Sequence, residues 1–119
     1  MKQTNCIEEV QEVQAALNDL RDDNILLKEQ LSEALSQDVS TDFVEKAEWF
    51  QQCFLETDQV IDLLRHEINI LLKNLQNSDR TEQFESQCNK LKTDVKKLAH
   101  STGENASMFR SFLARDTAN

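Results

Sequence analysis

The strongest structural signal in the chain is the stretch TDFVEKAEWFQQCFLETDQVIDLLRHEINILLKNLQ, residues 41–76. Apolar residues recur along it at alternating intervals of four and three, which places them on one face of a coiled-coil helix. The members of this seam are Phe43, Ala47, Phe50, Phe54, Thr57, Ile61, Leu64, Ile68, Leu71 and Leu75. Because the repeat skips no position, we expect one uninterrupted helix over residues 41–76.

The same stretch carries further apolar residues outside the seam. These are Val44, Trp49, Cys53, Val60, Leu63, Ile70 and Leu72. Such a broad apolar face indicates contact with more than one neighbouring helix. We therefore expect this helix to lie in the middle of a bundle or against a second chain.

A similar seam precedes this stretch and predicts a helix over residues 5–36. Its members are Cys6, Val10, Val13, Leu17, Leu20, Asn24, Leu27, Leu31 and Ala34. The segment SQDVSTD, residues 36–42, separates the two helices, because Ser40, Thr41 and Asp42 are residues that favour helix N-caps.

Downstream, QNSDR at residues 76–80 breaks the repeat, and a third helix is predicted over residues 79–115. Its seam contains Phe84, Cys88, Leu91, Val95 and Leu98, and in continuous phase it passes Thr102 and Asn105 to reach Phe109 and Phe112. Gly103 and a capping-box spacing from Ser101 to Glu104 favour a break, whereas the unbroken phase favours continuity. We expect a continuous or kinked helix there.

Short connections force neighbouring helices to run antiparallel, so the chain should form an elongated up-down-up three-helix coiled-coil bundle. Proline is absent and Gly103 is the only glycine among 119 residues, which disfavours tight turns and supports an all-α class. The length fits a single domain over residues 1–119.

Asn24 lies at an a position among leucines, an arrangement that resembles dimerising leucine zippers. No basic region precedes it, so zipper-type DNA binding is not implied. The alternative is an intrachain polar layer, because folding the helices back on one another brings Asn24 level with Thr57 and Thr102. We favour this intrachain arrangement, while a homo-oligomer stays possible.

The formal net charge of −9 argues against general nucleic-acid binding, which needs a basic surface. No stretch has the apolar length of a membrane span, and the first residues lack the apolar core of a secretory signal. Three cysteines without C-x-x-C spacing, namely Cys6, Cys53 and Cys88, suggest free, buried thiols in a reducing compartment. These features together predict a cytoplasmic protein. In the predicted topology only Cys6 and Cys88 share an end of the rod.

The sequence offers no catalytic, metal-binding or cofactor-binding constellation. His66 and His100 fall at outward heptad positions without partners at ligand spacing, and Cys53 has no nearby histidine. The carboxylates lie mostly on polar helix faces, whereas a general acid needs a buried pocket, which a rod of narrow seams does not supply. We therefore expect a protein that is not an enzyme and carries no cofactor or metal.

The segment ASMFRSFLAR, residues 106–115, is the best candidate for partner binding, since it gathers Met108, Phe109, Phe112 and Leu113 on one side. Trp49 is added as an off-seam aromatic residue. The same tail residues could instead close the end of the bundle. The sequence thus predicts a structural or adaptor coiled-coil protein that binds protein partners through helix faces. The alternative is an acidic inhibitor or nucleic-acid mimic that occupies the basic cleft of an enzyme.

Overall fold

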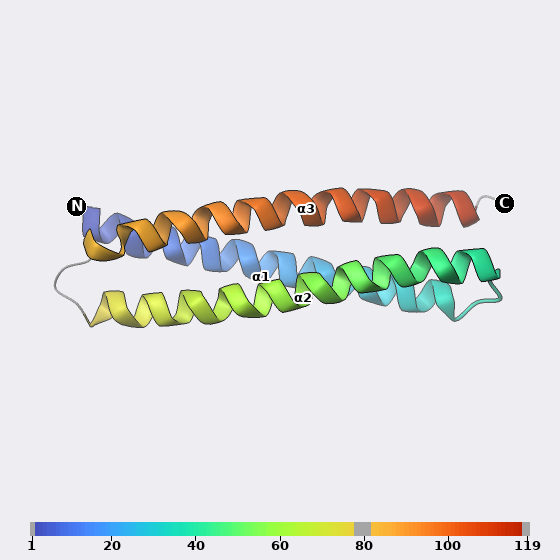
Figure 1. Ribbon diagram of the computed structural model, residues 1–119, viewed down its shortest axis with the longest axis horizontal. Helices are drawn as coiled ribbons and strands as arrows, with labels where there is room; N and C mark the ends of the chain where they lie inside the picture. Colours follow the sequence, from blue (N-terminus) through green and yellow to red (C-terminus); the bar gives the residue numbers. More distant parts are fainter. Residues whose placement is uncertain (1, 78–81, 118–119) are drawn as a thin grey trace.

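Three long α-helices lie side by side in the computed structural model, which describes residues 2–77 and 82–117 (Figure 1). Helix α1 spans Lys2–Leu35, α2 spans Thr41–Gln76 and α3 spans Glu85–Thr117, preceded by the 3-10 turn η1 at Glu82–Phe84. The rod measures 61 × 18 × 16 Å, and successive helices run in opposite directions. The predicted elongated, all-α three-helix bundle is confirmed. The predicted start of the third helix at residue 79 lies outside the described residues.

The core of α2 is the predicted seam. The buried residues of this helix are Phe43, Ala47, Phe50, Phe54, Thr57, Ile61, Leu64, Ile68, Leu71 and Leu75, without a gap in the repeat. A helix presents such a stripe to its neighbours because residues three and four apart lie on one face. The N-terminus of α2 is capped by Ser40, whose Oγ accepts a hydrogen bond of 3.1 Å from the Phe43 backbone N–H.

Helix α3 continues through Gly103 without interruption, as the unbroken heptad phase favours. Gly103 has no positive φ, and a Cβ added to it would meet no atom within 4 Å. The glycine therefore meets no local steric requirement. Its helical conformation is maintained by the core residues on either side, including Leu98, Ala106 and Phe109.

The core is divided into two clusters at the level of Asn24 and Thr57. One cluster joins the first half of α1 to the second half of α2 and the first half of α3, and the other joins the opposite halves. Asn24 and Thr57 are the buried polar residues between them. Asn24 also lines a cavity of about 260 Å³ with Thr102 of α3. The three residues thus lie at one level, as predicted.

Asn24, Thr57 and Thr102 do not form hydrogen bonds with one another's side chains. The Asn24 Nδ2 donates to the Phe54 backbone oxygen at 2.9 Å and to the Asp58 Oδ1 at 2.7 Å. Thr57 and Thr102 instead donate to backbone carbonyls of their own helices, those of Cys53 and Ala99. A threonine hydroxyl in a helix reaches the preceding turn easily, which explains this outcome.

The prediction of three free thiols is wrong for Cys6 and Cys88, which form a disulfide with their Cα atoms 6.4 Å apart. The up-down-up order brings the beginnings of α1 and α3 to the same end of the rod, within the reach of a disulfide. Cys53 is the free cysteine of the described chain, and it is half-buried.

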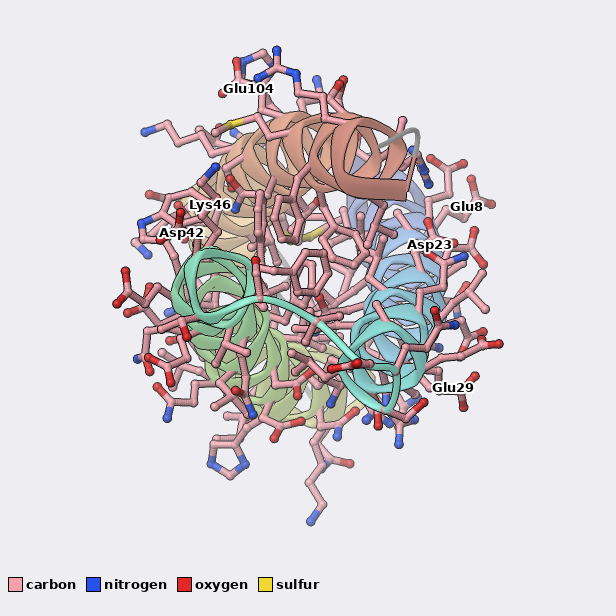
Figure 2. The ribbon with its side chains drawn as sticks, turned by 90° about the vertical axis from the view of Figure 1, so that its right-hand side faces the viewer. Glu8, Asp23, Glu29, Asp42, Lys46 and Glu104 are labelled. Carbon is pink, nitrogen blue, oxygen red and sulfur yellow. A yellow bond between two sulfur atoms is a disulfide. The ribbon has the colours of Figure 1, made fainter. Side chains whose placement is uncertain are left out.

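Helix α1 packs more extensively against both α2 and α3 than those two helices pack against each other. Its outer face is acidic, and Figure 2 shows Glu8, Asp23 and Glu29 pointing away from the bundle. One ion pair joins this acidic helix to α3, between Lys92 Nζ and Glu9 Oε1 at 3.3 Å. The weaker α2/α3 contact leaves a surface between those helices open, and this surface is the candidate site.

A candidate partner-binding groove between α2 and α3

A stripe of exposed apolar side chains runs along α2 beside the core seam. Trp49, Val60, Leu63 and Ile70 are exposed by 51%, 40%, 57% and 48%, and each directly precedes a buried seam residue. Trp49, Leu63 and Ile70 lie at one heptad position, and Val60 lies on the adjacent line nearer the buried face, so the four form a stripe along one side of α2. All four belong to the off-seam apolar residues from which the sequence predicted a broad apolar face on this helix. The face is broad, but no other helix among the described residues covers this part of it.

The facing edge of α3 is more polar. Lys90, Asp94, Lys97, Met108 and Ser111 each directly precede a buried residue of the α3 seam. Lys90 and Asp94 pair with each other at 2.8 Å, and this carboxylate, as hydrogen-bond acceptor and as charge, raises the pKa of the Lys90 amine. The α2/α3 groove, as we name the surface between the stripe on α2 and this edge of α3, thus has one mostly apolar wall and one mixed wall.

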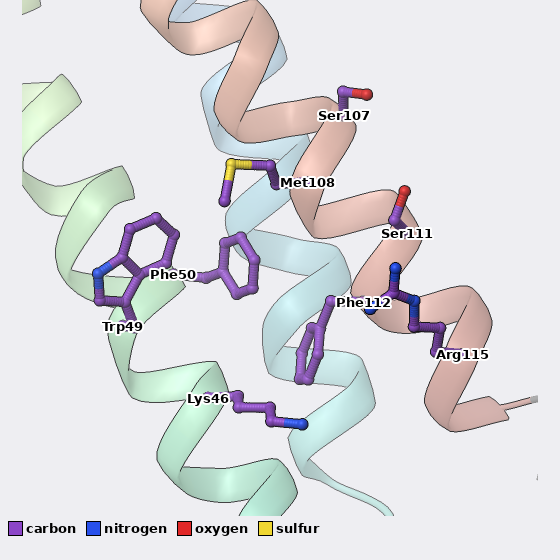
Figure 3. Close-up of a pocket in the computed structure, with 8 residues that line it drawn as sticks. All are labelled: Lys46, Trp49, Phe50, Ser107, Met108, Ser111, Phe112 and Arg115. Carbon is purple, nitrogen blue, oxygen red and sulfur yellow. The ribbon is translucent and has the colours of Figure 1, made fainter.

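Two hollows mark this groove. The aromatic hollow, about 540 Å³, lies near the beginning of α2 and the end of α3 (Figure 3). It is lined by Lys46, Trp49, Phe50, Ser107, Met108, Ser111, Phe112 and Arg115. The central hollow, about 480 Å³, is lined by Val60, Leu63, Leu64, Glu67, Lys90, Asp94, Lys97, Leu98 and Ser101.

The floor of the aromatic hollow is built from core aromatic residues. Phe50 and Phe112 stack with ring centroids 5.2 Å apart, and Phe109 meets Phe50 edge-on at 5.3 Å. Trp49 packs edge-on against Phe50 at 5.0 Å. Offset and edge-to-face arrangements are the ones that aromatic rings prefer, so the floor is a packed aromatic cluster, while Trp49 and Met108 are exposed beside it (Figure 3).

The candidate residues named from the sequence divide into two groups. Trp49 and Met108 are exposed, the latter by 52%, and they line the same hollow from opposite helices. Phe109 is fully buried, Phe112 is 9% exposed, and the half-buried Leu113 packs against the same core cluster. The sequence left open whether the tail binds a partner or closes the end of the bundle. Phe109, Phe112 and Leu113 close the bundle, although Phe112 also lines the hollow.

Sequence reasoning missed Lys46 and Arg115 as members of this hollow. Lys46 lies one turn before Trp49, and Arg115 lies two turns after Met108. Their heptad positions were available from the sequence, since both fall on the lines that border the seams. Which helix faces which line, however, depends on how the three helices are arranged around the core.

The described residues give no support to a metal site, since they contain no group of three or more His, Cys, Asp or Glu side chains placed to hold an ion. His66 is exposed, and His100 pairs with Glu104 at 2.9 Å on the surface of α3. Burial, with a smaller effect of Glu56, raises the pKa of the Cys53 thiol, which disfavours a reactive thiolate. None of the described helices is long and apolar enough to cross a membrane.

No model of a known protein family matches the chain, and no curated protein and no solved structure does so either.

Proposed function

We propose that this chain is a non-catalytic structural or adaptor protein that binds a helical segment of a partner protein in the α2/α3 groove. The observation that carries the proposal is the exposed stripe formed by Trp49, Val60, Leu63 and Ile70. Large apolar side chains gathered on one exposed face are typical of interaction sites, whereas scattered ones are ordinary.

A helix fits this groove better than an extended peptide for a geometric reason. The stripe follows two adjacent heptad lines of α2 over about 30 Å, from Trp49 to Ile70, at the rise of an α-helix. An amphipathic helix with the same repeat could match it along its length, and it would complete a four-helix bundle. The mixed wall of α3 offers Lys97 and Ser101 for polar contacts at the edge of such a helix.

A cytoplasmic location stays a prediction. This prediction rested in part on free thiols, which indicate a reducing compartment. The disulfide between Cys6 and Cys88 takes away that support, because disulfides persist mainly in oxidising compartments. Trapping the thiols with an alkylating reagent during cell lysis would report the state of this pair in its native compartment.

The test places a photo-crosslinking amino acid at Leu63 and, as a matched control, at Leu26. These residues are exposed by 57% and 53%, but Leu26 lies on α1 outside the groove. Crosslinks from position 63 should map to one helical segment of a partner, and a synthetic peptide of that segment should bind the purified protein. Binding should be lost in Leu63→Glu and kept in Leu26→Glu.

Two results would contradict the proposal. The first is a partner that binds Leu63→Glu and wild type equally well. The second is binding that disappears at high salt but ignores the groove variants, since an acidic mimic would behave in that way.

A further inference from the structure

The aromatic hollow carries a charge that distinguishes it from the rest of this acidic molecule. Lys46 and Arg115 are its charged lining residues, and no carboxylate belongs to the lining. Among the described residues neither cation forms an ion pair. Asp42 lies one turn before Lys46 on α2, and no ion pair of the described residues joins the two. A protein of net charge −9 thus presents, among its described residues, two cations outside any ion pair beside one apolar hollow.

The two kinds of lining are also separated in space. Trp49 and Met108 lie on the side towards the middle of the rod, and Lys46 and Arg115 lie nearer its end (Figure 3). The cations come from opposite helices, so they face the hollow from both sides. A ligand that fills this hollow must therefore be apolar at one end and negatively charged at the other.

We propose that the aromatic hollow binds an acidic, amphipathic helix, which inserts an apolar side chain between Trp49 and Met108 and places a carboxylate between Lys46 and Arg115. The inference rests on the proposed function and adds the chemistry and the orientation of the bound helix. The end of the helix that carries the carboxylate lies at the end of the rod where α2 begins.

The overall negative charge of the protein does not oppose such a partner at close range. Charges more than about 8 Å away are largely screened at physiological ionic strength, so the nearby cations dominate. Two partly exposed ion pairs contribute modestly to affinity but strongly to the choice between partners and orientations.

The experiment selects binders from a displayed library of amphipathic helices with fixed heptad leucines. The positions that flank the leucines vary among Glu, Gln and Lys, and the full chain is the target. The affinity of each selected peptide is then measured from the fluorescence of Trp49, the only tryptophan, which reports burial in the hollow directly.

We expect the selected helices to carry Glu beside the leucine that contacts Trp49. Replacing that Glu by Lys should weaken binding about fivefold at moderate salt, and the difference should vanish near 1 M salt. The K46E/R115E variant should reverse the preference. The control variant K73E/K96E carries the same change of charge, but outside the groove. Lys73, like Arg115, lies in the last turn of its helix. This control should keep the wild-type preference for Glu within about twofold.

The failures of the two proposals are distinguishable. Suppose that the selected helices lose binding in Leu63→Glu, but show no preference for Glu over Lys, or show the same preference in K46E/R115E. That result would overturn this inference and leave the proposed function standing. A library that yields no helix sensitive to Leu63→Glu would overturn both.

Discussion

Asn24 and Asp58 are joined across the α1/α2 interface by a hydrogen bond of 2.7 Å from the asparagine amide to the carboxylate. The same carboxylate also pairs with Lys28, one turn further along α1. Because Asn24 donates in addition to the Phe54 carbonyl, its amide nitrogen has two acceptors within the chain. A slip of α1 by one turn would leave a buried amide without these partners, so the contact fixes the register of the two helices.

Replacing Asn24 by leucine should leave the mass of the protein unchanged and change its melting temperature little. The lost hydrogen bond to the Phe54 carbonyl contributes about 1 kcal/mol and that to the Asp58 carboxylate about 1.5 kcal/mol, whereas a buried leucine gains roughly 2 kcal/mol between the two core clusters. The connections between helices still dictate the helix order. Light scattering and thermal denaturation of both proteins check this. A wild-type dimer whose mass changes on substitution would support the zipper alternative instead.

The disulfide between Cys6 and Cys88 should contribute strongly to stability, since it closes a loop with a sequence separation of 82. The chain-entropy argument gives roughly 4.5 kcal/mol for a loop of that length. Denaturant unfolding of the C6S/C88S variant should show a loss of this order. Cys53→Ser serves as the control, because Cys53 forms no disulfide. Equal stability of the double variant and wild type would mean that the crosslink is absent in solution.

Phe109 and Met108 are neighbours with opposite expected roles. Phe109→Ala removes a fully buried ring from the aromatic cluster and should lower the free energy of unfolding by about 3 kcal/mol or more. Met108→Ala changes an exposed side chain and should alter it by no more than about 0.5 kcal/mol, while weakening partner binding. Parallel unfolding curves separate the two. Similar losses in both variants would place Met108 in the core as well.

Gly103→Ala should stabilise α3 by about 0.5–1 kcal/mol, because glycine weakens a helix interior and the added methyl group meets open space. Circular dichroism during denaturation gives the value. A destabilised variant would show that the backbone at Gly103 departs from the helix in solution.

The Cys53 thiol should react slowly with alkylating reagents at pH 8, since burial and Glu56 raise its pKa above the ordinary cysteine value. The folded state then keeps the proton to a higher pH than the unfolded chain, so this group contributes stability that is lost as pH rises through its folded pKa. The alkylation rate of Cys53, measured in the protein with the Cys6–Cys88 disulfide intact, should therefore rise at a higher pH than the rate of a peptide thiol. In Glu56→Gln the rise should move only partly back, because burial is the larger cause.

The sequence by itself determined the helices and their buried faces. The ten seam residues of α2 are the buried ones, and the continuity of α3 through Gly103 follows from the heptad phase. Both properties depend on spacing along one helix, and a period of three and four residues records spacing directly. The level shared by Asn24, Thr57 and Thr102 could also be derived, since helix rise and chain reversal fix relative heights.

Only the tertiary structure decided which faces of different helices meet. Whether Trp49 and Met108 line one hollow, and whether Lys46 lies across it from Arg115, depends on the rotation of each helix about its own axis and on which side α1 occupies. The pairing of Cys6 with Cys88 likewise needed a separation between Cα atoms, because sharing one end of a rod does not bring two thiols within bonding distance. These relations arise from packing between residues far apart in the chain, and a repeat within a single helix carries no record of them.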